Sequence, residues 1–92
     1  MRDIDVIIQD LLATYPALQA TQLKVVHPGA DDDGLWFFRI PGNAIEVQLE
    51  STSGMCPFLF ESSGNDLRNN ANTVASAVAL VAAGLGLLGA AA

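Results

Sequence analysis

The first apolar positions along the chain recur every three or four residues. Six of them share one side of a helix at this spacing: Ile4, Ile7, Ile8, Leu11, Leu12 and Tyr15. Asp3 and Asp5 lie in the first turn, where the helix dipole favours negative charge. Because Pro16 disfavours helical geometry at the residue before it, the pattern predicts a helix over about residues 3–15.

The apolar period changes to two in the middle of the chain. Between residues 45 and 50, apolar side chains alternate with Glu46, Gln48 and Glu50, which is typical of a strand with one buried face. Turn residues such as Gly, Pro, Asn and Ser separate this region into short apolar runs. The pattern predicts antiparallel strands over about residues 22–27, 35–40, 44–51 and 56–61.

The same alternation assigns side chains to an inner and an outer face of the sheet. We place Arg39 and Glu61 outside, because burying an unpaired charge in a small core costs several kcal/mol of stability. Period two then puts five large residues inside, under the helices: Trp36, Phe38, Ile40, Phe58 and Phe60. Outside, Arg39 is expected to lie among three acids with which it can form cross-strand ion pairs: Glu46, Glu50 and Glu61.

Three apolar residues remain on the outer face beside these charges: Leu35, Phe37 and Leu59. Apolar groups clustered on a sheet face and rimmed by polar residues are typical of an interface. We therefore predict a dimer or partner surface formed by four residues: Leu35, Phe37, Arg39 and Leu59. The alternative is that a loop or the C-terminal tail covers this cluster.

The last part of the chain is polar at first and then carries no charge from Asn69 onward. Asp66 and Thr73 are both suitable N-caps, and we predict a helix over about residues 66–89. Its large apolar residues fall on one side, as in a helix packed on a sheet. Val74 to Ala92 is also long and apolar enough for a membrane anchor, but its Ala and Gly content favours packing. The end from Gly84 onward is expected to be a fraying tail or a contact between subunits.

These elements together predict a single α+β domain of 92 residues. Its expected architecture is an antiparallel three- or four-stranded sheet with N-terminal and C-terminal helices packed on one face, in α-β-β-β-β-α order. With 51% hydrophobic and 15% charged residues, the chain is apolar for a small monomer, which favours a partner. A net charge of −6 argues against a nucleic-acid partner. We expect a homodimer, with membrane association disfavoured.

Cys56 is the only cysteine, so no internal disulfide can form, and acids interrupt the first apolar run, unlike in a signal peptide. We infer a reducing, cytoplasmic setting. Cys56 and His27 could form a thiol nucleophile and its base, but the strand alternation points Cys56 inward and no further motif accompanies it. The acidic run Asp31–Asp33 lacks the alternate spacing of a calcium loop. We therefore expect no catalysis, no metal and no cofactor.

The run GLWFFRIP, followed by VQLES and GMCPFLFE, resembles a pattern in small uncharacterised bacterial proteins and covers about a third of the chain. This resemblance implies no activity. In outline, a small acidic chain with a helix, antiparallel strands and a helix is also similar to half of a type III secretion chaperone, whose dimers hold an extended partner chain. We expect a non-enzymatic interaction module. A binder of an extended chain, a tail-anchored protein and a Cys56-dependent enzyme are the alternatives.

Overall fold

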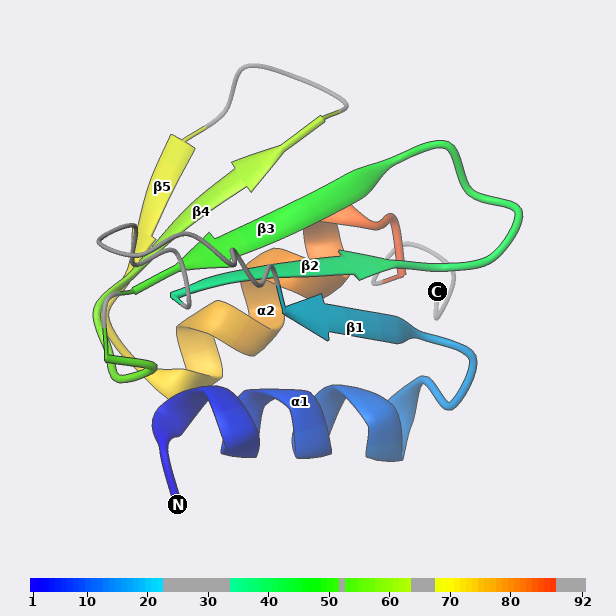
Figure 1. The fold of residues 1–92 in the computed structure, drawn as a ribbon. Helices are drawn as coiled ribbons and strands as arrows, with labels where there is room; N and C mark the ends of the chain where they lie inside the picture. The colour runs from blue at the N-terminus through cyan, green and yellow to red at the C-terminus, as the bar shows by residue number, and fades with distance from the viewer. Residues whose placement is uncertain (23–33, 52, 64–67, 88–92) are drawn as a thin grey trace, which may run out of the picture.

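A computed structural model of the chain describes residues 1–22, 34–51, 53–63 and 68–87. The elements within these residues follow the chain as α1 (Asp3–Thr14), β1 (Gln19–Gln22), β2 (Leu35–Arg39), β3 (Glu46–Glu50), β4 (Phe58–Ser62), β5 (Arg68–Ala71) and α2 (Val74–Gly84). The strands form one sheet in chain order, and each strand is antiparallel to the next. Figure 1 shows α2 crossing behind the sheet and α1 running below β1.

The predicted α+β class is confirmed, but the sheet has five strands among the described residues, not three or four. The additional strand is β5, which lies where we predicted the start of the final helix. That helix begins only at Val74, because Thr73 and Ser76 cap it reciprocally. The Ser76 N–H donates to Thr73 Oγ1 at 3.0 Å, and the Thr73 N–H donates to Ser76 Oγ at 3.1 Å. Residues 68–71 are thereby left to pair with β4.

The other predicted elements lie close to the observed ones, with one exception at the first strand. β1 occupies Gln19–Gln22, so only Gln22 falls in the predicted range of 22–27, and residues 23–27 lie outside the described part of the chain. The helix predicted over 3–15 is α1, whose buried residues are Ile4, Ile7 and Leu11. Leu12 was assigned to that buried side but is 39% exposed, because the row of α1 residues that contacts the core is narrower than the predicted apolar side.

The core lies between the inner face of the sheet and the two helices. Each inward side chain that the alternation predicted is buried or partly buried there, and Phe38 and Phe58 are almost completely enclosed. Trp36 packs edge-on against Phe58, with ring centroids 6.3 Å apart and ring planes at 75°. The assignment of inner and outer faces is therefore correct for β2, β3 and β4.

We predicted a fraying tail or a contact between subunits from Gly84 onward, but Leu85 and Leu87, which follow the end of α2, pack against the core. Leu85 is 3% exposed, and its carbonyl accepts a hydrogen bond of 3.2 Å from Asn43 Nδ2. Leu87 also contacts the core, while residues 88–92 lie outside the described part. Among the residues described, no helix combines the length and apolar character needed to cross a bilayer.

Candidate interaction surface

The side of the sheet that faces away from both helices is formed by every second residue of each strand. We call it the outer sheet face, and the strand register defines its members: Gln19, Thr21, Leu35, Phe37, Arg39, Glu46, Gln48, Glu50, Leu59, Glu61, Arg68 and Asn70. Neither α1 nor α2 packs on this face. The core residues against which the helices pack belong to the inner face of the sheet. All four residues predicted to form a partner surface belong to it.

The apolar members of the outer sheet face are close together but not continuous. Leu35 and Phe37 are two residues apart on β2, and both are partly buried. Leu59 lies on β4, in the same cross-strand row as Leu35, but Glu50 of β3 stands between them. Two strand spacings of about 4.8 Å separate these leucines. The surface is therefore apolar on either side of a charged residue.

The charges on this face are arranged differently from our prediction. Glu61 pairs with Arg68 of β5, whose Nη2 lies 2.8 Å from Glu61 Oε1, and not with Arg39. Arg39 lies opposite Glu46 in the register but makes no ion pair with any described residue. Glu61 was one of three acids that we expected near Arg39, because β5, which supplies a nearer cation, was not predicted. An exposed pair such as Glu61–Arg68 typically contributes only about 0.2–1 kcal/mol.

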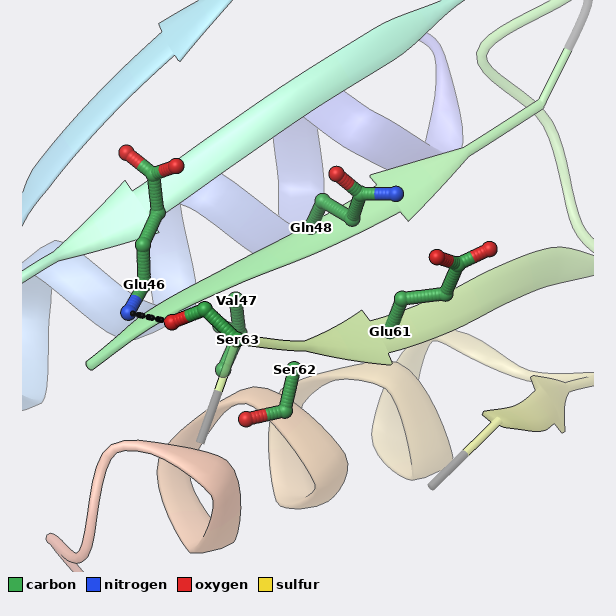
Figure 2. Close-up of a pocket in the computed structure, with 6 residues that line it drawn as sticks. All are labelled: Glu46, Val47, Gln48, Glu61, Ser62 and Ser63. Atoms are coloured by element: carbon green, nitrogen blue, oxygen red, sulfur yellow. Dashed lines mark hydrogen bonds between the residues drawn. The ribbon is translucent and has the colours of Figure 1, made fainter. Parts of the chain in front are cut away.

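Three shallow hollows open along the described part of the sheet. The first has a volume of about 140 Å³ and lies where β3 and β4 meet; Figure 2 shows its residues, with the Glu46 N–H donating a hydrogen bond of 2.9 Å to Ser63 Oγ. A second of about 380 Å³ adjoins it and is lined by Arg39, Asn43 and neighbouring residues. A third of about 300 Å³, beside Leu59, lies at the other end of the sheet. All three are open to solvent, which suits surface contacts better than enclosure of a small ligand.

Cys56 lies in the connection between β3 and β4, which docks on the first turn of α1. The Ile4 N–H donates to the Gly54 carbonyl at 2.9 Å, and the Cys56 N–H donates to Asp3 Oδ2 at 2.9 Å. The thiol is partly buried against the core, in the inward direction that we predicted. Burial raises its pKa, and the hydrogen bond and negative charge of Asp3 raise it further. His27, its suggested base, lies outside the described residues.

We expect Cys56 to react with iodoacetamide more slowly in the folded chain than in the chain unfolded by denaturant, at the same mildly alkaline pH. The reason is that only the thiolate is nucleophilic, and both burial and Asp3 disfavour it. Asp3→Asn should speed alkylation of the folded chain, whereas Asp10→Asn, on the same helix, should not. The rate can be followed by mass spectrometry. A folded chain that reacts faster than the unfolded one would show an activated thiol and revive the enzyme hypothesis.

The raised pKa of Cys56 also sets the direction of a pH effect. Its folded-state pKa lies above its unfolded value, so folding favours the protonated thiol. This contribution to stability is complete below the unfolded pKa and is lost as the pH rises through the folded pKa. Alkaline conditions should therefore destabilise the wild-type chain more than Cys56→Ala.

Neither a family model, nor a curated protein, nor a solved structure matched the chain when it was compared with them. Within the described residues, no group of three His, Cys, Asp or Glu side chains could hold a metal ion. Asp31–Asp33 lies outside that part of the chain. The outer sheet face is thus the feature from which function can be argued. Four of its members were not predicted from the sequence, because they lie on β1 and β5 outside the predicted strands: Gln19, Thr21, Arg68 and Asn70.

Proposed function

We propose that the protein is a non-enzymatic interaction module that forms a homodimer through the outer sheet face. One observation carries this proposal: both helices pack on one side of the sheet, and partly buried apolar residues lie on the other, beside charged ones. Complete burial of an exposed Leu or Phe contributes about 1.5–3 kcal/mol, and a second copy would add part of this for Leu35, Phe37 and Leu59, which are already partly buried. Such a cluster on a sheet face favours association of a second surface over it.

The size of the outer sheet face suggests that the dimer is weak. Strands spaced about 4.8 Å apart, with a rise of about 3.3 Å per residue, give the five strands a flat area of roughly 400 Å². A standard interface buries about 800 Å² on each partner. We therefore expect a weak dimer that is a monomer in dilute solution and assembles only at high micromolar concentration.

The test is the solution mass of the full chain and of Phe37→Glu, measured by light scattering from low to high micromolar concentration in detergent-free buffer. Wild type should approach the dimer mass as the concentration rises, while Phe37→Glu should remain monomeric, because the new charge would be buried against a second sheet. Gln9→Glu adds the same charge at an exposed position of α1 and should dimerise like wild type. A wild-type monomer throughout, or a dimer indifferent to Phe37→Glu, would contradict the proposal.

A binder of an extended partner chain is the second candidate, and the free edge of the sheet favours it. β5 is the last strand in the sheet order, and no described strand pairs with its outward edge. An extended segment can add to such an edge through main-chain hydrogen bonds. The raised pKa of Cys56 counts against the alternative of a thiol-dependent enzyme. If wild type is monomeric at every concentration, edge binding becomes the better supported proposal.

A further inference from the structure

We propose that the two-fold axis of this dimer runs between β2 and β3, parallel to the strands, so that Arg39 of each copy pairs with Glu46 of the other. This inference rests on the proposed function and specifies its geometry. The occupant of the outer sheet face is a second copy of this chain, and these charges orient it.

Arg39 and Glu46 are oppositely charged, lie at one end of the outer sheet face and form no ion pair with a described residue. They are direct cross-strand neighbours, and both are exposed. Neither forms an ion pair within the described part of the chain. Arg68, the other cation described on this face, is already held by Glu61 at 2.8 Å. Arg39 is therefore the cation that remains available there to an acid of another molecule.

The backbone of Glu46 is held by hydrogen bonds, whereas its carboxylate forms no ion pair with a described residue. The Glu46 N–H donates to Ser63 Oγ, and the Glu46 carbonyl accepts from the Ser63 N–H, each at 2.9 Å. Figure 2 shows the carboxylate extending away from the nitrogen that Ser63 holds. The hollow of about 380 Å³ that Arg39 and Glu46 line together leaves room beside them for a side chain of a second copy.

A symmetric dimer makes each contact twice. A two-fold axis parallel to the strands keeps each residue at its level along the strand and exchanges strands on either side of the axis. With the axis between β2 and β3, Arg39 comes to face Glu46 of the second copy, and the operation repeats the pair. Phe37 then faces the Gln48 side chain, and Leu35 faces the methylene stem of Glu50. Two sheets stacked in this way can keep the usual angle of about −30°.

Neighbouring axes of the same kind are less favourable. An axis along β3 places Glu46 and Glu50 each opposite the same residue of the second copy. An axis along β2 does the same for Arg39. An axis between β3 and β4 forms no pair of opposite charges among described residues. Like charges that face each other across an interface oppose association. Because each copy carries a net charge of −6, two cation–acid pairs at the contact would offset part of the general repulsion.

The test uses Arg39→Glu and Glu46→Arg, first separately and then mixed in equal amounts. In each variant alone, like charges meet twice across the axis, so we expect the dissociation constant of the dimer to rise about fivefold or more. In the mixture, one chain carries two acids and the other two cations at these positions. A heterodimer then forms two attractive pairs, so native mass spectrometry should show the mixed dimer in preference to either homodimer.

The mixed dimer is the informative outcome, because a charge effect confined to one copy could not be restored by adding a different copy. If both variants dimerise like wild type, or if the mixture stays monomeric while wild type dimerises, this axis is wrong, and the dimer itself stands on the Phe37→Glu result. If wild type is monomeric, the proposed function fails and this inference fails with it. Circular dichroism of each variant verifies the fold.

Discussion

Phe38→Ala should lower the free energy of unfolding by about 3–5 kcal/mol, whereas Phe37→Ala, one residue away on the same strand, should lower it by about 1 kcal/mol or less. Phe38 is completely buried between the sheet and the helices, so truncation leaves a cavity there. Phe37 lies on the outer sheet face and is only partly buried. A difference of this size between adjacent residues follows from the alternation of side chains in a strand.

Urea denaturation followed by tryptophan fluorescence can measure both variants, at a concentration low enough to keep the chain monomeric. Trp36 is 3% exposed and reports on the same core. Because Phe38→Ala could prevent folding altogether, Phe38→Leu provides a milder variant that should still lose more stability than Phe37→Leu. Equal losses in the two positions would mean that both faces of β2 are covered to the same degree, and the outer sheet face would then not be available to a second copy.

The faces of β2, β3 and β4 could be predicted because β3 is amphipathic over its full length, while β2 and β4 each carry one charged residue that marks the outer face. A strand has a period of two, so a few charged residues in β3 determine which side faces water. Arg39 and Glu61 then fix their neighbours by the cost of a buried charge. Three of the four predicted surface residues are apolar, and they were found as the exceptions to that alternation: Leu35, Phe37 and Leu59.

β5 could not be predicted in the same way, because its sequence contains almost no apolar residue. Of Arg68–Ala71, three residues are exposed and only Ala71 is buried. An edge strand needs little apolar surface, since its backbone pairs on one side and its other edge is open. Without β5, the Glu61–Arg68 ion pair was also missed, and Glu61 was counted among the acids that could pair with Arg39. The error in the candidate site thus follows directly from the error in the fold.

The close approach of α2 to the sheet was equally hidden from the sequence. Glycine in the last turns of a helix indicates weak helix propensity, and that is how Gly84 was interpreted. In the structure a Cβ atom built on Gly84 would lie 2.8 Å from both a ring carbon of Phe60 and a methyl carbon of Val47. Propensity describes a residue in isolation, whereas the space at Gly84 depends on two strands distant in the sequence.

Gly84→Ala should therefore destabilise the protein, by about 1–3 kcal/mol, because the added methyl group is forced into two buried side chains. The sign is decisive. If helix propensity alone mattered, alanine would stabilise the end of α2 by about 0.5–1 kcal/mol. Ala79→Gly, at an exposed position of the same helix, measures that propensity contribution directly. Both free energies can be obtained from urea denaturation of the monomer.

Val47→Ala supplies the space that Gly84→Ala lacks, so the two changes should be strongly non-additive. Each alone lowers stability, Val47→Ala because it leaves a cavity in the core. The stability lost in the double variant should be smaller than the sum of the two single losses by about 1 kcal/mol or more, because the new methyl group occupies part of that cavity. Additive losses would show that α2 moves away from the sheet to accept alanine. The contact of glycine with Val47 and Phe60 would then not determine how closely the helix layer packs.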